Sequence, residues 1–287
     1  MSRRLVLASC PQMPEGDGDD AGLVEALAEL GVEARWQPWG ERTAADETVV
    51  LRATWDYQDH LADFLDWCSQ VPRLINPYPV VTYNTDKTYL TRLAAAGLPV
   101  IPSTVLAPGE ELGETADDFV LKPTVGAGSR GAARFDRTQR EEARLHLKTL
   151  HSQGFSVLLQ PYQTSVDEEG EVSLVFFRGR YSHAFTKGPM LTGGVVDTQG
   201  ALYLEEHLAE TSPEPRWQEV ASDILRAAAS EIGIPLDQLV FARVDLVRGA
   251  DGPLLLELEM TEPGLGFPYV DPAALRRFAR ALADSCS

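Results

Sequence analysis

The sequence predicts an α/β domain followed by an α+β domain. Over the first third of the chain, short apolar runs alternate with helical patterns, which is typical of a largely parallel sheet flanked by helices. From about residue 100 onward, apolar runs follow one another in pairs across short turns, as in an antiparallel sheet. We therefore expect an N-terminal domain over residues 1–80 and a second domain over residues 81–287.

In the N-terminal domain, each predicted strand is an apolar run bounded by turn residues. These strands cover 4–8, 32–38, 48–52 and 73–75. Helices are expected over 21–30, where Gly31 ends an apolar stripe at helical spacing, and over 60–69. The chain then turns at 76–79. Asn84 or Thr85 is expected to cap a helix over 86–96, which Gly97 ends.

In the second domain, the predicted strands are rich in β-branched and aromatic residues. They cover 100–105, 118–122, 132–135, 156–160, 172–177 and 181–186, and a further hairpin covers 239–260. Helices are expected over 138–150, 217–232 and 272–283.

Composition and charge exclude several classes of function. The formal net charge of −18 argues against nucleic acid or an anionic membrane as the main partner, because both require a broad positive surface. No apolar run reaches the roughly 18 residues of a membrane-spanning helix, and no export cleavage pattern follows the N-terminus. Cys10, Cys68 and Cys286 are too far apart to indicate a disulfide framework or a zinc site. We expect a cytoplasmic protein, and a homodimer is one assembly that the sequence leaves open.

A glycine-rich segment at residues 126–131 fits the pattern G-x-G-x-x-G. A dinucleotide-binding loop with this pattern would open a helix, but the residues after Gly131 have a strand composition. A protein-kinase loop joins two strands and has its lysine on a later strand, whereas Lys122 lies just before this loop. Backbone N–H groups and a nearby lysine suit phosphate oxygens. An ordinary hairpin turn with a surface lysine is the alternative.

The last predicted hairpin carries charged residues on one face. Strand alternation places Arg243 and Asp245 on the same side of the first strand, and Glu257 and Glu259 on the same side of the second. If residues 250–252 form the loop, Asp245 lies opposite Glu257 and Arg243 lies opposite Glu259. Carboxylates at such close range need a cation between them. Mg²⁺ held by carboxylates and nucleotide phosphates fits, and a solvated hairpin face is the alternative.

Lys87 on an early helix, Lys122 before the glycine loop and the acidic hairpin together resemble the ATP-grasp superfamily. The chain resembles D-alanine–D-alanine ligases, glutathione-synthetase-like ligases and especially the cycloserine synthetases that cyclise O-ureidoserine. This resemblance implies a pre-ATP-grasp domain over 1–80 and an ATP-grasp fold over 81–287, with a small lid over about 100–160. It also implies a ligase that uses ATP and Mg²⁺ to activate a carboxylate as an acyl phosphate. An amine of an amino-acid-like substrate would then attack, releasing phosphate after ADP.

The resemblance also implies the residues of the site. The ATP-binding set is Lys87, Lys122, Gly126, Gly128, Ser129, Gln160, Pro161, Tyr162, Glu171 and Lys187. Within this set the lysines contact phosphates, the strand ending at Tyr162 holds the adenine, and Glu171 takes the ribose hydroxyls. Arg243 matches the arginine that stabilises the oxyanion of the tetrahedral intermediate, together with a backbone amide near Gly264, and Lys187 is counted with them as catalytic.

The metal ligands implied by the resemblance are Asp245, Glu257 and Glu259. Relatives more often have Asn at the last of these positions, so Glu259 adds a negative charge.

Residues 52–57 (RATWDY) resemble a signature of the cycloserine-synthetase-like group. They follow a predicted strand, where substrate-binding loops lie in α/β sheets. We count Arg52, Asp56 and Arg243 as substrate-binding, because Arg52 could hold a substrate carboxylate through two hydrogen bonds. An ion pair between Arg52 and Asp56 is the alternative.

The segment 188–200 lacks the Asp-Phe-Arg stretch expected in that group, which leaves the substrate open. Ligation of two molecules and cyclisation of one both remain. An ATP-grasp phosphotransferase and a non-catalytic ATP-binding protein are the other functions that fit the same residues.

Overall fold

The computed structural model describes residues 3–191, 194–195 and 207–286. Its N-terminal part is a parallel sheet in the order β2–β1–β3–β4. The strands are β1 (Arg3–Ser9), β2 (Val32–Pro38), β3 (Thr48–Ala53) and β4 (Leu74–Ile75), and the helices are α1 (Leu23–Glu29), η1 (Tyr57–Asp59) and α2 (Leu61–Gln70). Every residue of β3 is buried, as expected for a parallel strand covered on both faces.

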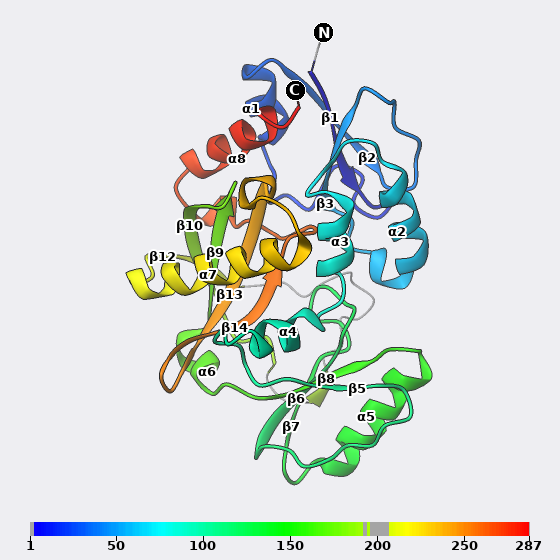
Figure 1. Ribbon diagram of the computed structural model, residues 1–287, viewed down its shortest axis with the longest axis vertical. Coiled ribbons are helices and arrows are strands. Elements are labelled where there is room, and N and C mark those ends of the chain that lie inside the picture. Colours follow the sequence, from blue (N-terminus) through cyan, green and yellow to red (C-terminus); the bar gives the residue numbers. More distant parts are fainter. Residues whose placement is uncertain (1–2, 192–193, 196–206, 287) are drawn as a thin grey trace.

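The alternation of side chains along β1 divides the core of this sheet into two layers. Leu5 and Leu7 pack with α1 and with the C-terminal helix α8 (Ala273–Ala283). Val6 and Ala8 pack on the opposite face with α2, because successive residues of a strand point to opposite sides. The last helix of the chain therefore covers a sheet built from the first residues, and the two termini lie close together (Figure 1).

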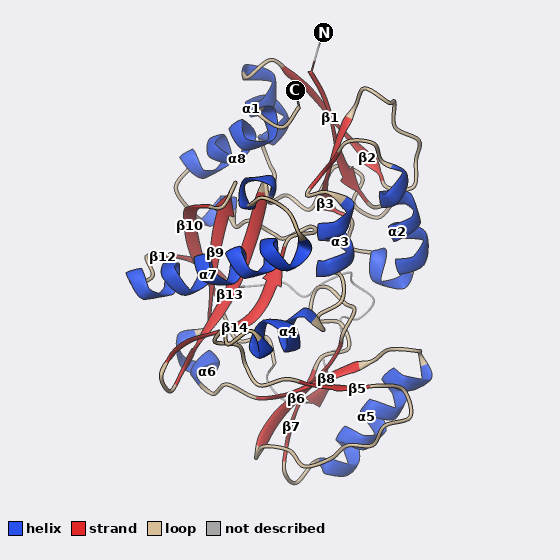
Figure 2. Ribbon diagram, viewed as in Figure 1, coloured by secondary structure: helices blue, strands red, loops and turns tan. Residues whose placement is uncertain are grey.

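The second sheet is antiparallel, in the order β12–β10–β9–β13–β14. Its strands are β9 (Glu171–Phe177), β10 (Arg180–Lys187), β12 (Leu208–Thr211), β13 (Phe241–Gly249) and β14 (Gly252–Glu259). The helices around it are α3 (Tyr78–Asn84), α4 (Tyr89–Ala95), α6 (Ser165–Glu169) and α7 (Pro215–Ile232), with short turns η2 (Leu236–Gln238) and η3 (Phe267–Tyr269). Figure 2 shows α7 lying across the strands, and its apolar residues share one core with α4, β9 and β13.

The third sheet, in the order β11–β7–β6–β8–β5, lies at the end of the molecule opposite the termini (Figure 1). Its strands are β5 (Thr104–Leu106), β6 (Asp118–Pro123), β7 (Ala133–Asp136), β8 (Val157–Pro161) and β11 (Gly194–Val195). Helix α5 (Arg140–Ser152) packs on this sheet around a core of its own, which includes Phe119, Phe135 and Leu147. This unit covers the range expected for the lid. That it moves as a lid stays a prediction, as does the domain boundary near residue 80.

Most predicted strands and helices are confirmed with small shifts at their ends, but the strand expected over 100–105 begins only at Thr104. Helices α3 and α6 and strands β11 and β12 were missed. Helix α3 forms where a turn was expected, and the capping role of Asn84 is wrong. Asn84 instead donates to the Leu258 carbonyl (2.6 Å) and accepts from the Met260 N–H (2.6 Å). The Tyr89 hydroxyl makes two further bonds to the Leu258 backbone. Because β14 is an edge strand, these side chains satisfy backbone groups that no neighbouring strand can reach.

The hairpin has the predicted pairs, Asp245 with Glu257 and Arg243 with Glu259, but reaches them differently. Gly249 pairs with Gly252, so the turn is shorter than expected. A β-bulge between Asp245 and Leu246 then restores the expected register. Among the described residues, none of the helices combines the length and the hydropathy needed to cross a bilayer.

Asn76 ties the N-terminal sheet to the central one. Its side chain donates to the carbonyls of Phe241 (2.8 Å) and Met260 (2.7 Å) and accepts from the Val240 N–H (2.9 Å). Asn76→Ala would leave these three buried groups without their partner. Since each unsatisfied group costs about 1–3 kcal/mol, we expect the free energy of unfolding to fall by about 3 kcal/mol or more.

Denaturant titration measures this loss. Ser69→Ala, which removes one exposed side-chain hydrogen bond, is the control and should change stability by less than about 0.5 kcal/mol. If the two variants were equally stable, Asn76 would not be the tie between the sheets.

Candidate active site

A cavity of about 450 Å³ is lined by residues from, or directly after, strands of all three sheets. All members of the predicted ATP-binding set line it: Lys87, Lys122, Gly126, Gly128, Ser129, Gln160, Pro161, Tyr162, Glu171 and Lys187. Arg243, Glu257, Glu259 and Gly264 line it as well. The fold thus brings together residues that are far apart in the chain, as the sequence predicted.

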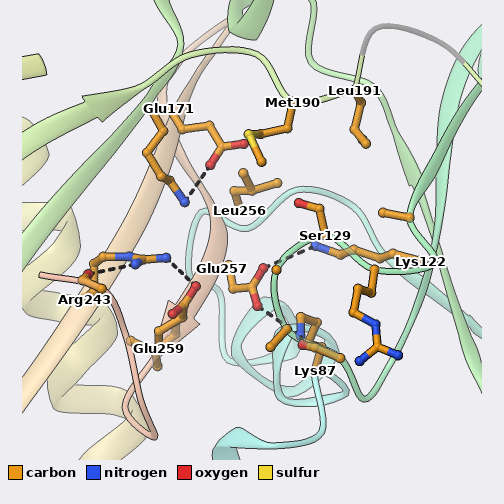
Figure 3. A pocket seen from close by; sticks show the side chains of 18 of the residues that line it. Lys87, Lys122, Ser129, Glu171, Met190, Leu191, Arg243, Leu256, Glu257 and Glu259 are labelled. Carbon is orange, nitrogen blue, oxygen red and sulfur yellow. Dashed lines mark hydrogen bonds and ion pairs between the residues drawn. The ribbon is translucent and has the colours of Figure 1, made fainter. Parts of the chain in front are cut away.

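Two lysines converge on one carboxylate at the floor of the cavity (Figure 3). Lys87 Nζ lies 3.0 Å from Glu257 Oε1, and Lys122 Nζ lies 3.9 Å from Glu257 Oε2. Burial lowers the pKa of Lys122. Burial alone would raise the pKa of Glu257, but Lys87 and Lys122 hold it below its usual value. Two buried cations around one carboxylate leave a net positive charge, which an anionic ligand would neutralise.

The glycine-rich loop adjoins these lysines. Its conformation depends on left-handed backbone at Gly128 (φ 59°) and Ser129 (φ 60°), and the Lys87 ammonium donates to the Gly126 carbonyl. The loop is fastened to the N-terminal domain through the Ala127 N–H, which donates to Gln58 Oε1 (3.0 Å). Lys122 is buried at the base of the loop, so the alternative of a hairpin turn with a surface lysine does not hold.

Arg130 makes a second fastening of the same loop. Its guanidinium forms two hydrogen bonds with the Asp59 carboxylate, at 2.9 and 3.0 Å. Both partners of the loop, Gln58 and Asp59, belong to η1.

Asp245 is the most buried acid of the central sheet, and its oxygens are fully engaged. It accepts hydrogen bonds from Arg243 Nε (2.9 Å) and Nη2 (2.9 Å), from Lys187 Nζ (2.8 Å) and from Ser173 Oγ (2.7 Å). Burial alone would raise its pKa, but Arg243 and Lys187 hold the pKa well below the usual range. Its side chain is 1% exposed and does not line the cavity.

The predicted role of Asp245 as a ligand of a metal ion shared by three carboxylates therefore stays a prediction, and in this structure Asp245 is paired with Arg243 and Lys187. In the part of the chain that the structure describes, no group of three or more His, Cys, Asp or Glu side chains could hold a metal ion. Strand alternation placed Asp245 on the expected face, where Lys187 Nζ from β10 lies 2.8 Å from Asp245 Oδ2. Glu257 and Glu259 remain available, since their side chains are 24% and 25% exposed and line the cavity.

Glu259 and Glu262 are acids held in a protein-lined environment. Burial raises the pKa of Glu259 to about 7, although the Arg243 guanidinium binds it. Burial and the nearby Glu259 raise the pKa of Glu262 to about 8, and the Tyr57 hydroxyl is hydrogen-bonded to it. The sequence reasoning did not single out Glu262, because its only signal was its position just before Pro263 and Gly264.

The structure does not bring Arg52 and Asp56 to the cavity wall. Arg52 donates to Asp20 (2.8 and 3.2 Å) and to the Pro263 carbonyl (2.9 Å), and its side chain is 1% exposed. Asp56 accepts from the Trp39 indole N–H (2.6 Å). In this geometry Arg52 pairs with Asp20 and not with Asp56, and its side chain does not line the cavity. Asp20 lies in a loop that carries no sequence signal, so this pair could not be predicted. From the segment 52–57, Trp55 and Tyr57 line the cavity instead.

The remaining predicted residues keep their roles as predictions. Glu171 faces the cavity and is paired with Lys187 at 3.0 Å. Gln160 and Pro161 lie on β8, and the Tyr162 N–H is donated to the Asp118 carbonyl (2.9 Å). Of the segment 188–200, in which an expected stretch is missing, residues 192–193 and 196–200 lie outside the described part of the chain. Further cavity residues that the sequence reasoning missed are Asp17, Asp19, Trp55, Tyr57 and Tyr269.

Comparisons with known proteins show the family of the chain. Residues 5–76 match the family described as D-cycloserine synthetase DcsG, N-terminal domain. The chain is 42% identical over 286 residues to the cycloserine biosynthesis protein DcsG of Streptomyces lavendulae, covering 93% of this chain and 94% of that protein. Its structure resembles the crystal structure of D-cycloserine synthetase DcsG with a TM-score of 0.87 and 38% identity, over 99% of this chain and 100% of that chain.

More distant structures share the ATP-grasp fold. The D-alanine–D-alanine ligase from Bacillus anthracis, solved with ATP, has a TM-score of 0.59 and 12% identity, over 99% of this chain and 97% of that chain. The ATP-grasp ligase PsnB, solved with Mg and ADP, has a TM-score of 0.60 and 18% identity, over 100% of this chain and 98% of that chain. At these identities the likeness shows the fold alone.

Lys122→Met should weaken nucleotide binding without loss of stability. The substitution removes a buried lysine from the cavity wall, and burial already disfavours the charged form of this lysine. We expect the Kd of a non-hydrolysable ATP analogue to rise by about tenfold or more, or at least about 1.4 kcal/mol. Calorimetric titration measures it, with Lys148→Met on the exposed face of α5 as the matched control. Equal affinities in two folded variants would remove Lys122 from the site.

Glu262→Gln should flatten the pH dependence of stability. Since the folded pKa of Glu262 is raised from 4.5 to about 8, its contribution to stability falls as the pH rises between these values. The gain in melting temperature of the variant over the native protein should therefore grow from pH 5 to pH 8.5. Thermal unfolding without nucleotide or divalent cation measures this, and the exposed Glu33→Gln controls for the loss of one negative charge. A gain that does not change with pH would contradict the raised pKa.

Proposed function

The chain belongs to the D-cycloserine synthetase DcsG family of ATP-grasp ligases, and we propose that it uses ATP to close the amide ring of cycloserine or of a close analogue. Members of this family are ADP-forming carbon–nitrogen ligases. The observation that carries the proposal is the convergence of Lys87 and Lys122 on Glu257 beside the glycine loop. Separate parts of the chain supply these groups to one cavity, and two lysines beside a glycine loop suit the phosphates of ATP.

We propose that Glu257 and Glu259 hold Mg²⁺ together with the nucleotide phosphates. Mg²⁺ takes one or two carboxylates and fills its remaining positions with phosphates and water, and these two glutamates are the acids of the hairpin that face the cavity. When bound, the ion would neutralise charge on the phosphates. Lys87 and Lys122 now share Glu257. They can turn toward phosphate oxygens once another cation compensates that carboxylate.

The proposed reaction has two steps. A substrate carboxylate oxygen attacks the terminal phosphorus of ATP, so that an O–P bond forms and the bond to ADP breaks. A nitrogen then attacks the carbonyl carbon of the acyl phosphate, loses its proton, and phosphate leaves as the C–O bond breaks. Positioning and charge stabilisation supply the catalysis in such a scheme, and no side chain has to act as a nucleophile.

Arg243 is the residue placed to stabilise the oxyanion of the second step. Its Nη1 donates to the Gly264 carbonyl (2.8 Å) and Asp245 holds the other side of its guanidinium. The Leu265 N–H is already donated to Asp19. A backbone donor for the oxyanion would therefore come from Gly264 or Gly266, which both line the cavity. Exclusion of water by the surrounding walls would protect the mixed anhydride.

Cyclisation is supported over ligation of two molecules by membership of the family rather than by any single residue. Purified enzyme should therefore be offered O-ureidoserine alone, in both configurations, and pairs of amino acids. Release of ADP from a single compound, with formation of its cyclic product, would support ring closure. Release that requires two compounds would support a ligase.

ATP and an amino-acid-like substrate are cytoplasmic metabolites, so we also propose that the protein is located in the cytoplasm.

ADP and phosphate should be the nucleotide products with any active substrate, because the proposed mechanism transfers the terminal phosphate of ATP to the substrate carboxylate. Chromatography of the products tests this, and AMP with pyrophosphate would falsify the acyl-phosphate mechanism. Hydroxylamine should trap the acyl phosphate of a two-substrate ligase as a hydroxamate. Trapping should be poor for a ring-closing enzyme, because a positioned nucleophile reaches an effective molarity of about 10⁵ M or more. A stable phosphorylated product would instead indicate a phosphotransferase.

A further inference from the structure

The N-terminal domain reaches across to the loop that follows β14. Asp19, in the loop before α1, accepts the Leu265 N–H at Oδ2 (2.5 Å) and the Phe267 N–H at Oδ1 (3.0 Å). Both oxygens of one carboxylate are thus engaged by backbone of a distant part of the chain, 246 residues away at Leu265. Hydrogen bonds from N–H groups to a carboxylate are about twice as strong as those between neutral groups.

A second contact from the same domain holds the start of this loop. Arg52 Nη1 donates to the Pro263 carbonyl at 2.9 Å. The guanidinium cannot turn away easily, because Asp20 binds its Nε and Nη2 and because it lies over the rings of Phe241 (5.6 Å) and Phe278 (5.2 Å). Arg52 also lies 3.8 Å from Asp19, which keeps the two contacts in one rigid group.

On its other side the loop contacts residues of the central sheet. The Gly264 carbonyl accepts from Arg243, and the Leu265 carbonyl is 2.8 Å from His183 Nε2. Gly266 has φ +71°, and a Cβ there would lie 2.5 Å from the Phe185 ring, so the loop has little room to adopt another path. Its position relative to Arg243 is therefore set by Asp19 and Arg52 on one side and by the central sheet on the other.

We propose that Asp19 is a positioning residue for the second chemical step, holding the loop 263–267 so that Gly264 and Arg243 face the oxyanion together. The inference rests on the proposed function and deepens it. In this proposal Asp19 acts through the loop, by way of its hydrogen bonds to the Leu265 and Phe267 N–H groups. A misplacement of about 1 Å can reduce a rate by about a hundredfold, so a small displacement of this loop is enough to be measured.

Asp19→Asn tests the proposal. The amide keeps the size of the side chain but presents an NH₂ group to one of the two N–H donors, which pushes the loop away. The first step should continue while the second slows, so the acyl phosphate would hydrolyse before it is captured. We expect product formation to fall about tenfold or more, the ratio of ADP to ligated product to rise above that of the native enzyme, and hydroxylamine trapping to increase. The affinity for an ATP analogue should stay within about twofold, since Asp19 is not in the nucleotide-binding set.

Two further variants keep the test decisive. Asp19→Glu retains the charge beside Arg52 but moves the oxygens, and it should also raise the ratio if Asp19→Asn is poorly folded. Glu47→Gln changes another buried acid of the same domain, which binds Arg35 and does not line the cavity, and it should leave the ratio unchanged.

The possible failures are distinguishable. If the native enzyme forms no ADP with any carboxylate substrate, the proposed function fails and the inference fails with it. If the native enzyme is active but folded Asp19 variants keep the native ratio, the inference alone is overturned. A rise confined to the KM of the amino-acid substrate would likewise overturn it, because that result would mean direct contact between Asp19 and the substrate.

Discussion

The arrangement of the cavity depends on one buried carboxylate, Asp245. It binds Arg243 and Lys187 at once, and both cations then project to the cavity wall. Burying such a group is costly unless it is fully paired, and losing one partner of a buried ion pair costs about 3–5 kcal/mol. The buried cluster is therefore weak evidence that the fold gains stability from it, but strong evidence that it fixes the orientation of Arg243 and Lys187. Because Asp245 holds one side of the Arg243 guanidinium, the other side is oriented toward Glu259 and Gly264. The geometry of this part of the cavity therefore depends on Asp245.

The segment between Arg52 and Asp59 extends this control to the other two sheets. Arg52 fixes the loop after β14, while Gln58 and Asp59 fasten the glycine loop at Ala127 and Arg130. The positions of two cavity walls thus depend on one short segment of the N-terminal domain. If the glycine loop closes over a nucleotide, its distance from Arg243 is set through this segment. The domain that holds none of the lysines of the site still decides how its parts face one another.

The sequence predicted more of the fold than of the contacts within the site. The spacing of apolar residues along the sequence located nearly every strand. The alternation of side chains along the hairpin predicted that Arg243 lies opposite Glu259, although a β-bulge is needed to reach that register. The spacing of apolar residues predicts which face of an element a residue occupies. It cannot predict which charged side chain of another element lies beside that residue. The sequence therefore revealed neither the ion pair of Lys187 with Asp245 nor the ion pair of Asp20 with Arg52. Asn84 was misjudged for the same reason, since its partners lie on a strand far along the chain.

The acids that face the cavity are difficult to explain by stability alone. Glu257, Glu259 and Glu262 lie near one another, and burial raises the pKa of Glu259 to about 7 and that of Glu262 to about 8. The raised pKa values mean that the surrounding protein favours the protonated, neutral form of these two acids. A fold selected only for stability would replace such groups with apolar or amide side chains. Their presence is understandable if the cavity is complementary to a loaded state, in which a divalent cation takes over from the protons and the lysines turn to phosphates. Buried, incompletely paired acids lower the stability of a fold, and such exceptions to the packing rules are expected at functional sites. They therefore mark this cavity as the functional site of the protein.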